Sequence, residues 1–102
     1  MMDYKIRISS FAIRDVQDAY SWYEKQRVGL GEELLYELGI AYKHIANHPQ
    51  FYGFIDDRKV LRDLLINRFP YLVVYKITGE IIHVIAVHHA KKHPSKKYGD
   101  NG

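Results

Sequence analysis

A group of titratable side chains follows the most strongly apolar stretch of the chain. His88 and His89 are adjacent, and Lys91 and Lys92 come directly after them. An imidazole titrates near neutral pH, so either histidine could act as a general base or a general acid. Lys91, Lys92 and the earlier Arg62 could hold a phosphate. A base, an acid and nearby cations are together what acid–base chemistry on a phosphate group requires.

The same residues are also typical of a solvated strand end, which carries polar side chains without any function. Adjacent residues of a strand point to opposite faces, so His88 and His89 cannot easily share a metal ion. His44 and His48 stand four residues apart, but the carboxylate of a helical zinc-binding motif is missing between them. We therefore expect no metal and no cofactor.

Length and composition indicate an ordinary globular domain. The 102 residues are 47% hydrophobic and 26% charged, and cysteine is absent, which excludes disulfides and a thiol nucleophile. No apolar run reaches the roughly 18 residues of a membrane span, and no signal peptide opens the chain, so we expect a soluble cytoplasmic protein. We expect one domain over residues 1–102, with residues 95–102 as a frayed tail.

The formal charge of +3 is unevenly distributed along the chain. Residues 1–50 hold six Lys and Arg against seven Asp and Glu, whereas residues 51–102 hold nine against five. The C-terminal half is therefore the one that suits a polyanion or an acidic partner protein.

Hydrophobic periodicity predicts two helices and four strands. Apolar residues recur at steps of three and four in the helical stretches, and Val, Ile and Tyr are dense in the later strands. The predicted helices span Phe11–Gln26 and Glu32–Asn47, and the predicted strands span Tyr4–Ser9, Val60–Ile66, Tyr71–Ile77 and Glu80–His88. The order β-α-α-β-β-β predicts a two-layer α+β fold, with a helical hairpin packed on one face of a small, mainly antiparallel sheet.

A tight turn at Thr78-Gly79 is expected to join the last two strands. This turn would place Ile77 opposite Glu80 and would give the strands one apolar face and one mixed face. We expect the apolar face to meet the helices, and either a ligand or partner to cover the mixed face or that face to be free surface. The predicted apolar face carries Tyr71, Val73, Tyr75, Ile77, Ile82, Val84 and Ala86, and the mixed face carries Leu72, Val74, Lys76, Ile81, His83, Ile85, Val87 and His89.

Several segments in this order resemble the RelE/ParE superfamily of toxins from type II toxin–antitoxin pairs. The resemblance covers positions 4 to 94, and no single motif carries it alone. The matching segments are Ala12–Tyr23 with its Asp15, Gly29-Leu30-Gly31, Asn47-His48-Pro49, Arg68–Tyr75, and Ile85–His89 followed by basic residues and Pro94.

The resemblance implies a small toxin that a cognate antitoxin neutralises. In such pairs the antitoxin is typically a DNA-binding protein, so operator DNA is reached only through it. RelE-like members cut mRNA on the ribosome without a metal. ParE-like members inhibit DNA gyrase. We expect the antitoxin to cover the mixed face at Leu72, Val74, His83 and Ile85.

One departure and one likeness bear on the choice between these target classes. Ribosome-dependent members usually carry an arginine early in the strand where this chain has Leu72, and Arg68 lies only before that strand. The start Phe69-Pro70-Tyr71 and the His88-His89 ending resemble the ParE and plasmid-stabilisation branch. The resemblance thus favours a ParE-like gyrase inhibitor.

Two alternatives stay open. One is a RelE-like endoribonuclease with His88, His89 and Arg62 as catalytic residues, and the other is a decayed, non-toxic homologue that still binds an antitoxin. On any of these interpretations Arg68, Lys91 and Lys92 could bind phosphate or an acidic partner.

Overall fold

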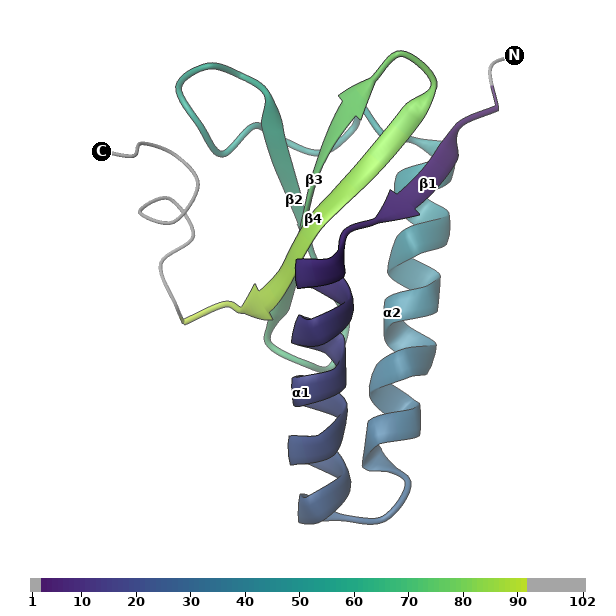
Figure 1. Cartoon of the computed structure of the whole chain (residues 1–102), viewed down its shortest axis with the longest axis vertical. Coiled ribbons are helices and arrows are strands. Elements are labelled where there is room, and N and C mark those ends of the chain that lie inside the picture. Colours follow the sequence, from purple (N-terminus) through teal and green to yellow (C-terminus); the bar gives the residue numbers. More distant parts are fainter. Residues whose placement is uncertain (1–2, 92–102) are drawn as a thin grey trace.

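The fold is an α+β sandwich in a computed structural model that describes residues 3–91. Its order β-α-α-β-β-β and its two layers confirm the predicted fold class (Figure 1). Lys92 and the tail 95–102 lie outside the described residues. The elements are β1 (Lys5–Ile8), α1 (Ser10–Gln26), α2 (Leu30–Asn47), β2 (Leu61–Leu65), β3 (Tyr71–Thr78) and β4 (Ile81–His89).

The four strands form one mixed sheet in the order β1-β4-β3-β2. β1 runs parallel to β4, whereas β3 pairs antiparallel with both β4 and β2. The two helices lie side by side and extend well past the sheet at the lower end of Figure 1. β3 and β4 are the two central strands, and nearly all of their side chains are buried or half-buried, which accounts for their apolar sequences.

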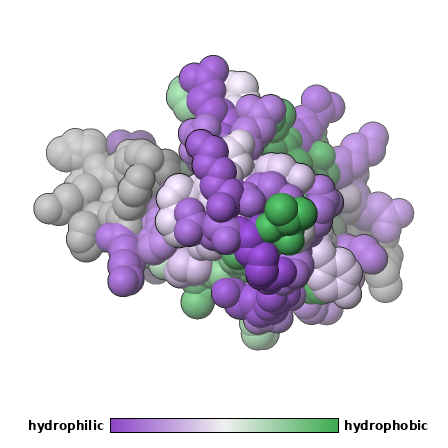
Figure 2. Space-filling model, turned by 90° about the horizontal axis from the view of Figure 1, so that it is seen from below, coloured by the Kyte–Doolittle hydropathy of each residue, from purple (hydrophilic) through white to green (hydrophobic). Residues whose placement is uncertain are grey.

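The turn between the helices is fixed by a carboxylate of α1. Glu24 accepts hydrogen bonds from the backbone N–H groups of Gly29 and Gly31, at 2.8 and 2.9 Å. Gly29 has a φ of +91°, which glycine adopts without steric cost, and a Cβ at Gly31 would lie 2.8 Å from the Tyr20 ring. The end of the molecule seen in Figure 2, from below, is mainly hydrophilic with small hydrophobic patches.

The main core lies between the helices and one face of the sheet. Tyr75 is fully buried there, and its hydroxyl donates a 2.6 Å hydrogen bond to the carbonyl of Pro49, where α2 has ended. Burial of these side chains supplies most of the stabilisation. The buried cluster comprises Ala12, Ala19, Leu34, Leu38, Ala41, Ile45, Ile66, Phe69, Val73, Tyr75, Ile82, Val84 and Val87.

The turn between β3 and β4 differs by one residue from the predicted turn. Thr78 pairs with Ile81, so the two turn residues are Gly79 and Glu80, and Ile77 does not oppose Glu80. Gly79 has a φ of +61° and is the first of the two central residues. A type II′ hairpin places its glycine there, whereas the prediction had placed it second.

A β-bulge in β4 is the larger departure from the predicted pairing. Tyr75 pairs with Val84, but the preceding residue Val74 pairs with Ala86, so Ile85 has no partner on β3. The extra residue inverts the alternation of side chains in the rest of the strand.

Side chains beyond the bulge therefore lie on the faces opposite to those predicted. Val87 belongs to the core cluster, although the prediction placed it on the mixed face. Ala86 is buried but lies outside that cluster, although the prediction placed it on the core face. His89 follows Val87 by two residues and contacts Tyr71 on the helix side.

Two side chains from the start of α1 bind the backbone of β4 at this bulge. β1 pairs with β4 only as far as Ile8 and Val84. Ser9 then caps α1 by accepting from the N–H of Ala12 at 3.0 Å, while its hydroxyl donates to the carbonyl of Ile85 at 2.8 Å. One turn later, Asp15 accepts from the N–H of Val87 at 2.9 Å.

Ser9→Ala should lower the free energy of unfolding by about 1–2 kcal/mol, because it removes a helix cap and a hydrogen bond to the bulge. Urea unfolding followed by circular dichroism measures the change. Ser10→Ala is the matched control, since Ser10 is exposed and its side chain makes no hydrogen bond within residues 3–91. An equal loss in both variants would contradict the role of Ser9.

Candidate functional site

A cleft lies between α1 and the ends of β3 and β4. Its volume is about 390 Å³. α1 supplies one wall, because Asp15, Asp18 and Trp22 recur at helical spacing and share a face. The cleft is lined by Asp15, Asp18, Ala19, Trp22, Tyr23, Tyr71, Val87, His88 and His89.

Four rings from α1, β3 and β4 contact one another in series and form an aromatic wall, which shares Trp22 with the helix wall. Tyr23 makes edge-to-face contacts with Trp22 at 4.9 Å and with Tyr71 at 6.1 Å between ring centroids. Tyr71 in turn contacts the ring of His89 at 5.3 Å. Burial, together with the nearby Tyr23 and Asp15, raises the pKa of Tyr71, so its hydroxyl stays protonated at neutral pH.

The charge on the helix wall is negative. Asp15 uses one carboxylate oxygen to accept from the N–H of Val87. Asp18 is exposed and makes no hydrogen bond or ion pair within residues 3–91. Of the residues in this described part of the chain that line the cleft, none is lysine or arginine.

The two histidines lie on opposite faces of β4, as adjacent strand residues must. Nδ1 of His89 accepts from the N–H of Lys91 at 3.1 Å, which assigns the ring proton of the neutral form to Nε2. His89 faces the cleft. His88 is only 5% exposed, and its Nδ1 lies 3.1 Å from the carbonyl oxygen of His89.

Asp63 interacts electrostatically with His88. Burial raises the pKa of the Asp63 carboxyl, and the charge of His88 opposes that rise. Asp63 pairs with Val74 on β3, and the next row of the sheet pairs Leu72 with His88. His88 and Asp63 therefore belong to the face of the sheet that the helices do not cover.

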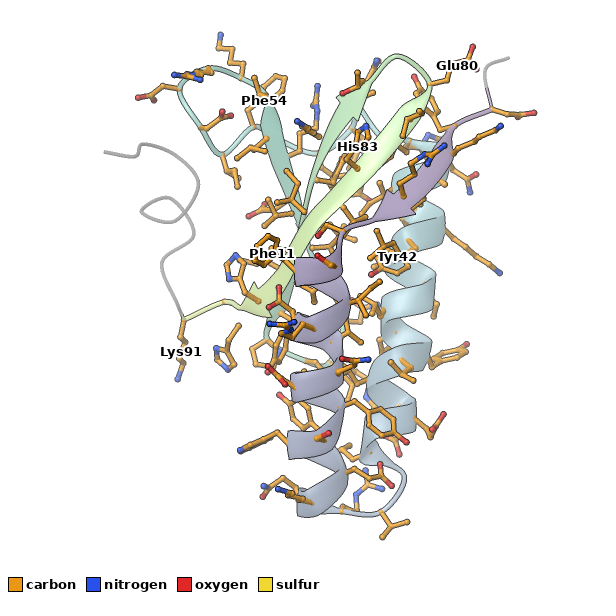
Figure 3. All side chains as sticks on the ribbon, in the orientation of Figure 1. Phe11, Tyr42, Phe54, Glu80, His83 and Lys91 are labelled. Carbon is orange, nitrogen blue, oxygen red and sulfur yellow. The ribbon has the colours of Figure 1, made fainter. Side chains whose placement is uncertain are left out.

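Arg62 is not brought to the histidines. Its guanidinium donates to the carbonyls of Gln50 and Tyr52, at 3.0 and 2.6 Å, and lies 3.9 Å above the Phe54 ring centroid. Phe54 stands beside the opposite end of the sheet from Lys91 in Figure 3. Arg62 thus holds the segment after α2 against β2.

Arg68 is also engaged by carboxylates. It forms ion pairs with Glu33 at 2.5 Å and with Glu37 at 3.9 Å, both on α2. The hydrogen bond from Arg68 is the main cause that lowers the pKa of Glu33. Lys91 is exposed beyond the end of β4 (Figure 3), and Lys92 lies outside the described residues.

The face predicted to bind the antitoxin is only partly accessible. Leu72, His83 and Ile85 are half-buried, so each of them presents some side-chain surface. Val74 is fully buried and has no surface with which to contact a partner. Leu65, which pairs with Leu72 across β2 and β3, is 58% exposed.

The described part of the chain holds neither a metal-binding cluster nor a membrane-spanning helix. Among residues 3–91, no group of three or more histidines and carboxylates is placed to hold a metal ion. No helix in the same range has both the length and the apolarity to cross a membrane.

The same fold occurs in a solved structure of low sequence identity. A chain of the solved structure titled as the chromosomal ParDE TA system from P. aeruginosa superposes with a TM-score of 0.76. The match covers 86% of this chain and 97% of that chain, with 14% sequence identity. Neither a protein-family model nor a curated protein matches the sequence. The shared feature is thus the fold.

Sequence reasoning identified His89 but not the cleft that His89 faces. Asp15 entered only as part of a family resemblance, and Asp18 was not singled out in the sequence. Their spacing with Trp22 at positions 15, 18 and 22 is the signal that could have marked a shared helix face. The part of the cleft formed by Val87 and His89 depends on the bulge in β4, which no sequence pattern indicated.

Asp63→Asn should stabilise the fold at neutral pH. The pKa of Asp63 is higher in the folded protein than in the unfolded chain, so the folded protein binds this proton more tightly. The stability of the fold therefore falls as the pH rises through the folded pKa. Asparagine carries no charge, so it removes the free-energy cost of burying an ionised carboxylate. The variant's advantage in Tm should therefore be largest near pH 7 and narrow as the pH falls toward 4. A constant advantage across this range would contradict the assignment, and Asp57→Asn in an exposed loop is the charge-matched control.

Proposed function

We propose that this chain is the toxin of a type II toxin–antitoxin pair and that it acts by binding DNA gyrase rather than by cutting RNA. The fold shared with a chain of a ParDE system supports the toxin assignment. The resemblance of the strand start and strand end to the ParE branch supports gyrase as the target. Such a toxin would act in the cytoplasm, with the cognate antitoxin as its second partner.

The observation that carries the choice against RNA cleavage is the sign of the charge among the residues that line the cleft beside His89. A nuclease of this type needs cations where the scissile phosphate lies, because the transition state gathers negative charge there. Here Asp15 and Asp18 line the same cleft as His89. These carboxylates would repel a phosphate instead of stabilising it.

Two of the four cations that the sequence offered for this task are engaged away from His89, whereas Lys91 follows His89 closely and Lys92 lies outside the described residues. Arg62 donates to two backbone carbonyls, and Arg68 is paired with Glu33 and Glu37. Leu72 occupies the strand position at which ribosome-dependent members usually carry arginine. His88 is only 5% exposed, so little of its ring is open to an RNA hydroxyl. A binding function requires none of these groups to meet.

Purified toxin should inhibit supercoiling by DNA gyrase, and His89→Gln should inhibit equally well, because no proton transfer is involved. In cells, a brief induction should lower thymidine incorporation before leucine incorporation. Ribosome-dependent mRNA cleavage that His89→Gln abolishes would contradict the proposal. Loss of all toxicity with antitoxin binding retained would indicate a decayed homologue and would equally contradict it.

The antitoxin is proposed to cover the sheet face that the helices leave open. Leu72, His83 and Ile85 offer a mixed, half-buried surface there, and Leu65 extends it across β2. Figure 3 labels His83 on β4. A partner that binds there would remove the apolar part of this surface from water, which favours association.

Leu72→Asp and Leu65→Asp should each weaken the antitoxin complex by about tenfold or more, because a charge would be desolvated at the interface. Isothermal titration with the antitoxin encoded beside the toxin measures the affinity. Val28→Asp makes the same type of change at an 86% exposed position in the turn between α1 and α2, and it should leave the affinity for the antitoxin unchanged. Unchanged affinity in folded Leu65→Asp would exclude this face.

A further inference from the structure

We propose that the cleft between α1 and the end of β4 is a binding site for a cationic side chain, with a guanidinium preferred over an ammonium. The site goes beyond the proposed function and does not depend on it. It rests on the coincidence of a cavity of about 390 Å³, aromatic walls and two carboxylates in one place.

The aromatic wall supplies the first part of such recognition. Trp22, Tyr23 and Tyr71 line the cleft, and the successive edge-to-face contacts hold their rings in fixed orientations. A cation near the face of an aromatic ring is attracted by its quadrupole, and tryptophan is the strongest ring for this. A planar guanidinium can also stack on such a ring, which a lysine ammonium cannot do.

The carboxylates supply the second part and determine the sign of the ligand. Asp18 is exposed on the cleft wall and has no hydrogen bond or ion pair within residues 3–91. Asp15 is held in place because it accepts from the N–H of Val87, and only one of its two oxygens is used in that bond. A guanidinium can donate to a carboxylate with two N–H groups at once.

Neutral and anionic ligands fit this cleft less well. An anion would meet two carboxylates without any lysine or arginine among the lining residues of the described chain. A purely apolar group would bury the Asp18 carboxylate without a partner, which costs free energy. A cation with a flat, weakly hydrated end is the group that satisfies both walls.

Trp22 is the only tryptophan of the chain, so its fluorescence reports on this cleft directly. We would titrate the protein with Nα-acetyl-arginine methylamide at constant ionic strength, and with the lysine and citrulline analogues. The NMR signal of the Trp22 indole N–H would be followed in parallel. The arginine analogue should give a saturable change, the lysine analogue a weaker one, and the uncharged citrulline analogue about tenfold weaker binding or none.

Asp18→Asn should weaken binding of the arginine analogue by about threefold, as expected for an exposed charge pair. Asp57→Asn removes the same charge from an exposed loop outside the cleft and should leave the affinity unchanged. Equal binding of the arginine and citrulline analogues would overturn the proposal. So would full affinity in Asp18→Asn, or the absence of a saturable change in both the fluorescence and the NMR signal.

Discussion

The arrangement of this molecule depends on how the backbone of β4 is satisfied after β1 ends. A strand edge carries N–H and C=O groups that cost free energy when they are buried without partners. Past Val84, α1 replaces β1 as the neighbour of β4, and a helix cannot continue the ladder of backbone hydrogen bonds. Side chains take over this task, since Ser9 donates to the carbonyl of Ile85 and Asp15 accepts from the N–H of Val87. The start of α1 is thereby attached to the sheet.

The bulge at Ile85 gives this attachment a consequence for the site. Because one extra residue inverts the alternation, Val87 and His89 turn toward the helices, while His88 turns to the open face of the sheet. Asp15, which binds the strand just past the bulge, is at the same time a wall of the cleft that His89 faces. The cleft and the α1–β4 connection therefore depend on the same few atoms.

The sequence allowed the layer architecture to be predicted because periodicity records which face of an element is buried. It did not allow the bulge to be predicted, because the residues of Ile81–Val87 that point to either face of the sheet are largely apolar. A one-residue shift therefore does not change the hydrophobic pattern of this strand. For the same reason Val87 was assigned to the wrong face. The partners of Arg62 are carbonyls of the segment after α2, and such contacts between distant residues have no signature in local sequence. Arg62 was therefore grouped with histidines that it does not approach.

Charge placement connects the fold to the kind of function that the molecule can support. The C-terminal half has an excess of basic residues, yet Arg62 and Arg68 are engaged by carbonyls and carboxylates and do not line the cleft that His89 lines. The cleft beside His89 instead takes its charge from α1, in the half of the chain where acidic residues outnumber basic ones. Asp15 cannot be exchanged freely because it also holds the strand, and its negative charge is thus tied to the fold itself. A histidine held beside such a carboxylate is poorly placed to act on phosphate, and the same cleft is well placed to receive a cation.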